Sequence, residues 1–438
     1  MMKRALWFLF LFIYYSNGCF SQILLTLDKS FKLLEEQNED LRQANVHLLL
    51  GKINVKESRD AFYPDIGLNV SHQYNFGLSF DQVAGQLITG NKWSKTANAN
   101  ISLRTTVFQG MSRVGRLQIA LAQLESQTLK VNELNKSLRL EVLTRFFEIL
   151  TNIALLKTSE KQVEYAKYLL SEEQQKLNLG INTLLDVAQS ENQVAESSLN
   201  SSSVKNALEI SLMEFKLLLG IPITDSVRLI EGEFDRDPNA IFIINDDILN
   251  DPSILIAENE IIESELSLKY AKSSYFPSIS LYSGYGTNYS SERKDYLTGE
   301  NMPFGSQVEQ NKSFNFGVSL TIPIFDGFKT KNNISKLRLQ LEERKSKYNK
   351  IRAEKEKVYQ IAVQEYKRGL LELNLHRVQK AALERNFNAI KERYEIGASN
   401  AMEFNKAQLD LNLSELRLIN STYICKLNFQ VLKILFNN

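Results

Sequence analysis

The distribution of proline limits what this chain can fold into more than any other feature. All seven prolines lie outside two stretches, residues 65–221 and 324–438. Proline costs about 3 kcal/mol inside a helix, so both stretches are free to form long helices. Within them, residues 111–179 and 328–396 are rich in Leu, Glu, Lys, Gln and Arg. As helices, each would extend about 100 Å.

These long helices are predicted to pack side by side. Apolar or small residues in the first of them are separated by alternating steps of four and three, at Leu117, Leu121, Leu124, Thr128 and Val131. This spacing is typical of coiled coils. A helix of such length also needs a neighbour along its whole apolar stripe. We therefore expect a mainly α-helical fold.

The two halves of the chain resemble each other in sequence. The pairs that share one constant offset in residue number are Leu103 and Leu320, Phe108 and Phe325, Gly110 and Gly327, and Gly180 and Gly397. Upstream, the offset from Pro64 to Pro277 is shorter by four, so the second copy carries four extra residues before its glycine. The period is far longer than a solenoid repeat of about 20 to 50 residues. The pattern predicts an internal duplication.

Each half also contains two strand candidates of about ten residues, within predicted β-hairpins at residues 66–108 and 279–325. The strands alternate apolar and small polar side chains; the first places Ile66, Leu68, Val70, Tyr74 and Phe76 on one face. A soluble β-sandwich would also alternate in this way. The strand length, the terminal aromatics and the polar, glycine-containing loops favour membrane strands that line a water-filled lumen.

Four strands cannot close a barrel, and open strand edges are not tolerated in lipid. The chain must therefore oligomerise, and three copies would supply twelve strands. No segment after the N-terminus has the roughly 20 unbroken apolar residues of a membrane helix. If the protein crosses a membrane, it is expected to do so with strands.

The N-terminus is interpreted as an export signal, residues 1–21. Lys3 and Arg4 precede an apolar stretch, residues 5–15, that is too short to span a bilayer. Cleavage before Gln22 and acylation of Cys19 as a lipoprotein are both open alternatives. In either case the mature chain leaves the cytoplasm.

The charge balance and the histidines argue against two classes of function. Lys and Arg number 52 and Asp and Glu 51, so the chain has no basic excess for nucleic acid. The three histidines, His47, His72 and His376, are far apart and lack metal-ligand spacing. No phosphate-binding loop or nucleophile elbow is present. We expect no enzyme activity, no metal and no cofactor.

With these features together, the chain resembles the TolC-type outer-membrane efflux proteins. The motifs that carry the resemblance are the glycine turns at residues 179–189 and 396–406, each after a long helix and in register with a hairpin. The resemblance implies a trimer with one shared twelve-stranded transmembrane β-barrel and a helical α-barrel. The implied organisation is a first repeat at residues 22–220 ending in helix 183–220, an equatorial segment at 221–251, and a second repeat at 252–438 ending in helix 400–436.

The resemblance also implies a function and partners. The family forms the passive exit duct of tripartite efflux or type I secretion systems in the Gram-negative outer membrane. A periplasmic adaptor, or membrane fusion protein, joins it to an inner-membrane RND or ABC pump, and the pump selects the cargo. The implied adaptor-contact tip comprises Gly180, Ile181, Asn182, Thr183, Leu184, Gly397, Ala398, Ser399, Asn400 and Ala401. The alternative is a trimeric coiled-coil protein with a structural or adhesive role in the cell envelope.

The residues at the family's pore constriction correspond here to Glu403, Lys406, Tyr394 and Asp186. The resemblance implies a hydrogen bond from Tyr394 to Asp186 that holds the tip closed. Glu403 keeps one ring of three acids, but Lys406 replaces the second acid and puts cation selectivity in doubt. Ser399 stands where relatives often have an arginine that reinforces closure.

Overall fold

The computed structural model describes residues 23–181, 183–231, 249–399 and 401–436. The expected signal peptide with Cys19 lies outside the described residues, as do Asn182 and Asn400 of the expected tip. Most of the segment between the expected repeats, residues 232–248, also lies outside them.

The chain forms two compact units that alternate along the sequence. The first unit takes its described residues from Met1–Val46, Leu129–Leu255 and Lys350–Asn438. The second unit consists of His47–Thr128 and Ile256–Asn349. The first contains most of the long helices, and the second contains the main sheet and the helical residues nearest to it in sequence.

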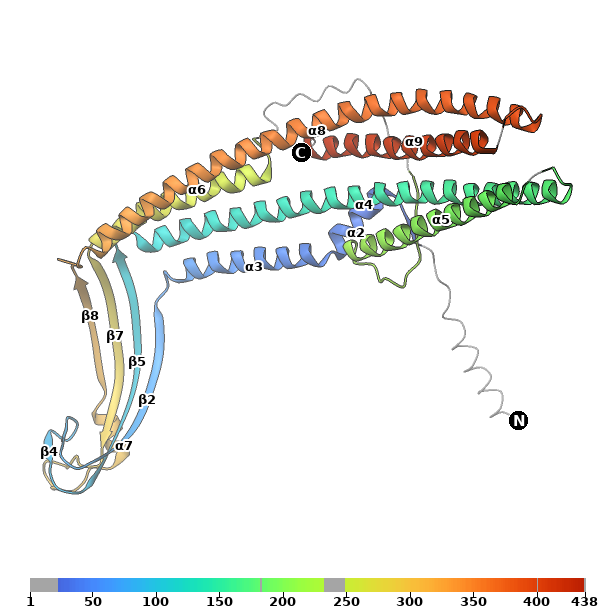
Figure 1. Cartoon of the computed structure of the whole chain (residues 1–438). Coiled ribbons are helices and arrows are strands. Elements are labelled where there is room, and N and C mark those ends of the chain that lie inside the picture. The colour runs from blue at the N-terminus through green and yellow to red at the C-terminus, as the bar shows by residue number, and fades with distance from the viewer. Residues whose placement is uncertain (1–22, 182, 232–248, 400, 437–438) are drawn as a thin grey trace, which may run out of the picture. The chain divides into compact units, whose positions relative to one another are not determined.

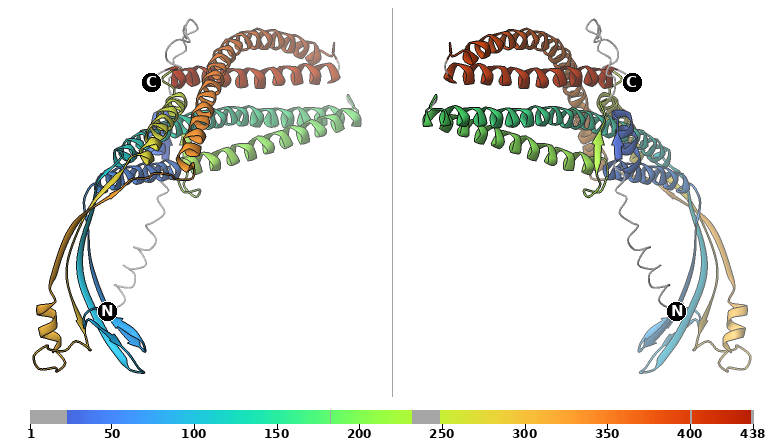
Figure 2. Two further views of the ribbon diagram at one scale, coloured as in Figure 1. Left: turned by 90° about the vertical axis from the view of Figure 1, so that its left-hand side faces the viewer. Right: turned by 90° about the vertical axis from the view of Figure 1, so that its right-hand side faces the viewer.

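Long helices dominate the first unit. Two helices of 67 residues, α4 (Ser112–Asn178) and α8 (Lys329–Glu395), are unbroken, as expected for segments without proline. Within this unit α5 (Leu184–Leu218) runs back along α4, and α9 (Ala401–Phe436) runs back along α8 (Figures 1 and 2). We call these pairs the first and second helical hairpins. The prediction of a mainly helical chain with a small antiparallel sheet is confirmed.

Shorter elements complete the helical part of the chain. They are α2 (Leu27–Gln37), α3 (Glu39–Asp60), α6 (Pro252–Ala271), the 3-10 helix η2 (Lys272–Tyr275) and α7 (Phe304–Gln310). Near α2, β1 (Ile23–Leu25) pairs in parallel with β6 (Val227–Leu229). The strand β6 belongs to the segment expected to form an equatorial belt, whereas β1 was not anticipated.

The core of the first unit contains two clusters of buried side chains. The larger cluster is centred on Phe146, Phe147 and Phe215, each at most 1% exposed. The smaller cluster includes Tyr366 and Phe429, whose rings lie 5.5 Å apart. Burying an aromatic side chain stabilises a fold by about 1.5 to 3 kcal/mol, so these clusters hold each hairpin together at its base.

The second unit is built on a four-stranded antiparallel sheet in the order β2-β5-β7-β8, visible in Figure 1. Its strands are β2 (Asp65–Phe76), β5 (Trp93–Gln109), β7 (Ser278–Ser290) and β8 (Ser313–Thr321). Strands β3 (Ser79–Asp81) and β4 (Gln86–Ile88) form a small separate ribbon in the loop between β2 and β5. The sheet joins the two halves of the sequence through the pairing of β5 with β7.

The sheet differs from the strands predicted from the sequence in two details. The register between β5 and β7 shifts between Thr106 and Phe108, so Val107 is the extra residue of a bulge and Phe108 pairs with Ile279. The regular alternation expected along this strand is therefore interrupted at Val107. Strand β8 also ends at Thr321, before Pro323, because proline has no N–H to donate to a ladder.

Across the part of the chain that the structure describes, no helix has both the length and the apolar character needed to cross a bilayer.

Candidate functional site

The end of each helical hairpin is a glycine turn. Gly180 and Gly397 have φ values of 73° and 75°, a left-handed conformation that glycine adopts without a side-chain clash. At the first turn the N–H of Ile181 donates to the carbonyl of Lys176 at 2.9 Å, and at the second the N–H of Ala398 donates to that of Arg393 at 2.7 Å. Both are Schellman motifs, which satisfy carbonyls at a helix end. The prediction that these glycines end the long helices is confirmed.

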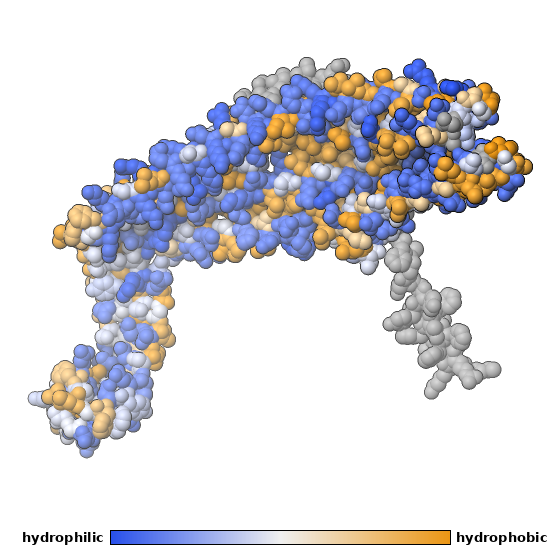
Figure 3. Space-filling view, in the orientation of Figure 1, coloured by the Kyte–Doolittle hydropathy of each residue, from blue (hydrophilic) through white to orange (hydrophobic). Residues whose placement is uncertain are grey.

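The turns expose apolar side chains. The residues concerned are between 66% and 79% exposed: Leu179, Ile181, Leu184, Leu185, Ile396 and Met402. Figure 3 shows apolar side chains gathered at the ends of the hairpins. Exposed apolar side chains grouped in this way are typical of a surface that contacts another protein.

Asp186 is engaged locally at the start of α5. Its carboxylate accepts the hydroxyl of Thr183 at 2.6 Å and the backbone N–H of Thr183 at 3.0 Å. Together with the Asp186 N–H donated to the Thr183 hydroxyl, these bonds form a capping box. The hydrogen bond from the Thr183 side chain, followed by that from its backbone, lowers the pKa of Asp186.

Tyr394 forms a different bond from the one expected. Its hydroxyl donates to Oε1 of Glu173 on α4 at 2.6 Å. The expected hydrogen bond to Asp186 is therefore wrong for this structure, because Tyr394 donates its single hydroxyl proton to Glu173, while Oδ2 of Asp186 accepts from Thr183. Tyr394 and Asp186 line the same groove of about 600 Å³ between the two hairpins, but they do not bond to each other.

Glu173 is the residue that sequence reasoning missed. Its side chain is only 5% exposed and pairs with Lys176 Nζ at 3.0 Å, while Lys176 also donates to the Tyr394 hydroxyl at 3.3 Å. Burial opposes the charge of Lys176, but its bonds to Glu173 and Tyr394 outweigh burial and raise its pKa. The three residues form a closed triangle that joins α4 to α8, which we call the tip latch.

Aromatic packing supports the tip latch. The ring of Tyr394 stacks on Phe404 of α9 with centroids 4.8 Å apart and an interplanar angle of 17°. Burial, and then the hydrogen bond to Glu173, raises the pKa of Tyr394 above its ordinary value. The hydroxyl therefore stays protonated and available as the donor near neutral pH.

The remaining predicted constriction residues lie on the first turns of α9. Glu403 and Lys406 are not buried, and the Ser399 hydroxyl donates to Oε2 of Glu403 at 2.6 Å. Thr183, Leu184, Ala398 and Ser399 of the expected tip all lie at the hairpin ends. The backbone of Ala401 begins α9. Among the described residues, no group of three or more His, Cys, Asp or Glu is placed to hold a metal ion.

The second unit presents a separate candidate surface, one face of the sheet. Apolar residues pair across strands and share this face, as in Ile66 with Leu103 and Leu281 with Val318. They remain exposed in the single chain; Leu68 is 69% exposed and Phe316 80%. The opposite face carries small or polar residues, for example Ser102, which pairs with Gly284. One face is suited to lipid and the other to water.

Comparison with known proteins gives a consistent result. The sequence profile of the family described as outer membrane efflux protein matches residues 31–221 and 243–436. The chain is 20% identical to outer membrane protein TolC of Salmonella enteritidis over 406 residues, which cover 89% of this chain and 77% of that protein. It is 24% identical to the solvent efflux pump outer membrane protein SrpC of Pseudomonas putida over 321 residues, covering 70% of this chain and 64% of SrpC.

Solved structures share the fold. The outer membrane channel CmeC of Campylobacter jejuni superposes with a TM-score of 0.80 at 16% identity, covering 94% of this chain and 85% of CmeC. The open state of the MtrE outer membrane channel of Neisseria gonorrhoeae superposes with a TM-score of 0.74 at 15% identity, covering 94% of this chain and 88% of MtrE.

Proposed function

This chain belongs to the outer membrane efflux protein family, and we propose that three copies of it form the passive exit duct of a tripartite efflux or type I secretion system. The duct lies in the outer membrane of a Gram-negative cell. In this proposal a periplasmic adaptor connects it to an inner-membrane RND or ABC pump, and the duct itself catalyses no reaction. The pump determines which cargo passes.

The observation that carries this proposal is the incomplete sheet. Among the residues that the structure describes, its outer strands, β2 and β8, each pair with one neighbour, and its apolar face remains exposed. Unpaired strand edges are costly in lipid, so the sheet needs further strands to close. Three copies of a four-stranded sheet supply the strands of a twelve-stranded barrel with lipid outside and water inside.

An internal duplication is part of the proposal, with the repeats placed at residues 22–220 and 252–438. The family profile matches once in each half. The backbone offers a second, independent argument, because Gly110 and Gly327 are each followed by a non-glycine residue with positive φ, Met111 at 68° and Phe328 at 63°. Such a conformation is uncommon outside glycine, and its recurrence at the same offset supports a common origin.

The hairpin ends are the proposed contact site for the adaptor. Their exposed apolar side chains, such as Ile181 and Leu184, lie beside hydrogen-bonded Schellman turns. A turn already ordered by hydrogen bonds lowers the entropy lost when a partner binds. An α-helical hairpin of an adaptor would cover this surface.

The proposed gate is the tip latch together with the charges on α9. The latch joins the two hairpins of each chain and favours a closed tip. Glu403 and Lys406 would place one acidic and one basic ring in the pore of a trimer, about one helical turn apart. Opposite rings so close together partly cancel in their effect on passing ions.

Two measurements test the duct. Trimers purified from outer membranes should conduct ions in planar bilayers, whereas a structural or adhesive coiled-coil protein would give no conductance. Cysteine at Ile181 should crosslink to an adaptor in intact cells, while cysteine at Lys205, an exposed position on α5, should not. A soluble monomer without conductance would exclude the proposal.

A further inference from the structure

A buried carboxylate, Asp251, lies at the base of the helical hairpins, just before α6. The residue is 2% exposed. Its Oδ1 accepts the backbone N–H of Ser253 at 3.0 Å, and its carbonyl accepts the N–H groups of Ile254 and Leu255 at 2.9 and 3.1 Å. Asp251 therefore caps α6, with Pro252 at the first helical position where a missing N–H costs nothing.

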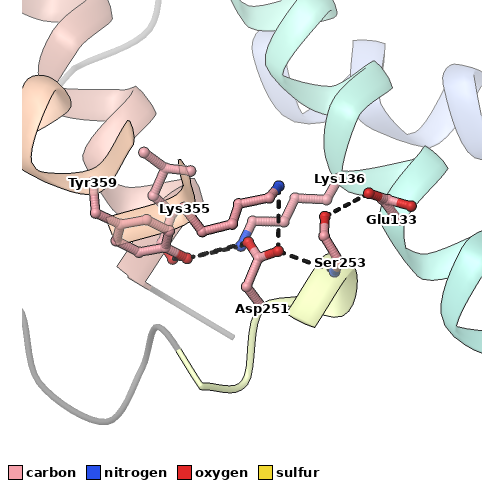
Figure 4. Close-up of polar contacts among 7 residues, drawn as sticks. Glu133, Lys136, Asp251, Ser253, Lys355 and Tyr359 are labelled. Carbon is pink, nitrogen blue, oxygen red and sulfur yellow. Dashed lines mark hydrogen bonds and ion pairs between the residues drawn. The ribbon is translucent and has the colours of Figure 1, made fainter. Parts of the chain in front are cut away.

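Two lysines from different halves of the sequence neutralise this carboxylate. Lys136 on α4 places Nζ 3.3 Å from Oδ2, and Lys355 on α8 places Nζ 3.3 Å from Oδ1 (Figure 4). Burial opposes ionisation of Asp251, but Lys355 and then Lys136 outweigh it and lower its pKa. The side chain is thus an anion held between two cations. A buried charge of this kind is strongly destabilising once a partner is removed.

Two further bonds complete the cluster. The hydroxyl of Tyr359 on α8, a fully buried residue, donates to the carbonyl of Leu435 near the end of α9 at 2.9 Å and accepts from Lys136 Nζ at 3.3 Å. The hydroxyl of Ser253 donates to Oε1 of Glu133 on α4 at 2.5 Å. Parts of α4, α6, α8 and α9 therefore meet around one carboxylate.

In the first half of the chain, an uncharged residue caps the equivalent helix. Asn38 precedes Asp251 by the same offset that separates Pro64 from Pro277. Its side chain accepts the N–H of Leu41 at 3.0 Å and so caps α3, and its amide also donates directly to the carbonyl of Leu218 at 2.9 Å. Leu218 precedes Leu435 by the offset that separates the two turn glycines, so the two carbonyls occupy equivalent positions.

The comparison of Asn38 with Asp251 separates the capping role of this position from the effect of the negative charge on Asp251. An amide can both accept and donate, whereas an ionised carboxylate can only accept. In the second half, the hydroxyl of Tyr359 supplies the missing donor; the equivalent position in the first half is Val142. Capping therefore does not require Asp251 to be charged. What the charge adds is the pair of bonds to Lys136 and Lys355, which joins α4 of the first half of the chain to α8 of the second half.

We propose that Asp251 is a positioning residue that fixes α4 and α8 relative to each other at the base of the hairpins and thereby keeps the tip latch in register. This inference rests on the proposed function as a gated duct. Lys136 lies about 55 Å along α4 from Glu173, and Lys355 about 58 Å along α8 from Tyr394. With arms of this length, a tilt of about 1° at the base moves the tip by about 1 Å. Such a shift breaks a hydrogen bond of 2.6 Å.

Three variants of the full-length trimer separate the cross-repeat bond from other effects. Asp251→Asn keeps the cap, as Asn38 shows, but removes the charge. Lys136→Met removes the bonds of Lys136 to Asp251 and Tyr359 and leaves Asp251 paired with Lys355. Lys355→Met removes the ion pair that joins Asp251 to α8 and leaves Lys136 bonded to Asp251. The matched control is Lys136→Arg, which retains the charge and should behave as wild type.

The main measurement is the distance between spin labels on exposed tip-proximal positions, Lys167 on α4 and Glu392 on α8, with one labelled chain per trimer. Asp251→Asn and Lys136→Met should broaden the distance distribution at least twofold and raise single-channel conductance or open fraction about threefold. Lys355→Met should broaden the distribution as well, because it breaks the arm of the link that joins Asp251 to α8. Unchanged distributions in these three variants, or equal broadening in Lys136→Arg, would overturn the proposal. If the wild-type protein showed no conductance, the proposed duct function would be excluded. The distance measurement would still test whether Asp251 positions α4 and α8.

Discussion

From the tip latch we predict a result that differs from the one expected from the sequence, because Tyr394 bonds to Glu173 rather than to Asp186. Tyr394→Phe removes the hydroxyl that donates to Glu173 at 2.6 Å but retains the ring that stacks on Phe404. Glu173 keeps its bond to Lys176 at 3.0 Å, so no charge is left without a partner. The substitution therefore removes the two hydrogen bonds of the Tyr394 hydroxyl, to Glu173 and from Lys176, and keeps the packing of the ring.

The magnitude follows from the burial and charge of the acceptor. A hydrogen bond to a charged group contributes about 1.5 to 3 kcal/mol, and Glu173 is buried, so water cannot fully replace the lost donor. Loss of this amount shifts the balance between closed and open tips by roughly tenfold to a hundredfold per chain. Single-channel recording in planar bilayers should show a higher conductance or open fraction for Tyr394→Phe than for wild type.

Asp186→Asn provides the matched control. The structure places this carboxylate in the capping box of α5, at the third helical position, so the substitution changes a local cap and should leave the tip latch unaffected. If Asp186→Asn opened the channel as much as Tyr394→Phe, or if Tyr394→Phe behaved as wild type, the latch drawn here would be refuted.

Further predictions concern the sheet, the turns, the pore and the acid stability of the protein. Leu320→Arg should reduce membrane assembly relative to Ser319→Arg on the opposite face, because arginine facing lipid near the midplane costs about 2 to 4 kcal/mol; trimer yield in outer membranes is the measurement. Gly397→Ala should destabilise the turn by about 1 kcal/mol, owing to its positive φ of 75°, and lower the melting temperature. Lys406→Ala should increase cation selectivity, measured as a shift in reversal potential under a salt gradient; an unchanged potential would place this lysine outside the pore. Burial opposes ionisation of Asp251, but Lys355 and Lys136 hold its pKa below the ordinary value of an aspartate in the folded chain. Its ionisation therefore contributes stability at pH values above that ordinary value, and this stability is lost as pH falls through the folded pKa. Denaturant unfolding at pH 7 and pH 3 should therefore show a smaller difference between wild type and Asp251→Asn at the lower pH, and a constant difference would contradict the charge assignment.

The sequence by itself determines the features of this protein that depend on neighbours along the chain. The two helices of 67 residues follow from the absence of proline and from the spacing of apolar residues. The left-handed turns at Gly180 and Gly397 follow from glycine at the end of each periodic segment. The alternation in β2 and β8 indicates the apolar face of the sheet before any pairing is known. Each of these signals is local, because backbone conformation and side-chain periodicity are set within a few residues.

Two helix caps observed in the structure also correspond to local patterns in the sequence. Thr183 followed three residues later by Asp186 has the spacing of the capping box that the structure forms, and the expected bond from Tyr394 did not take this signal into account. Asp251 before Pro252 is likewise a typical helix start. Both patterns predict a cap, but neither reveals which distant side chains approach it.

Only the tertiary structure determined the partners of the charged and hydroxyl groups. Tyr394 bonds to Glu173, which is 221 residues away in the sequence, and Asp251 bonds to Lys136 and Lys355 from two different helices. Helices as long as α4 and α8 offer many carboxylates and ammonium groups at similar spacing. Which of them meet depends on the axial register and rotation of one helix against another. That register is set by the packing of whole helices, so no local pattern can specify it.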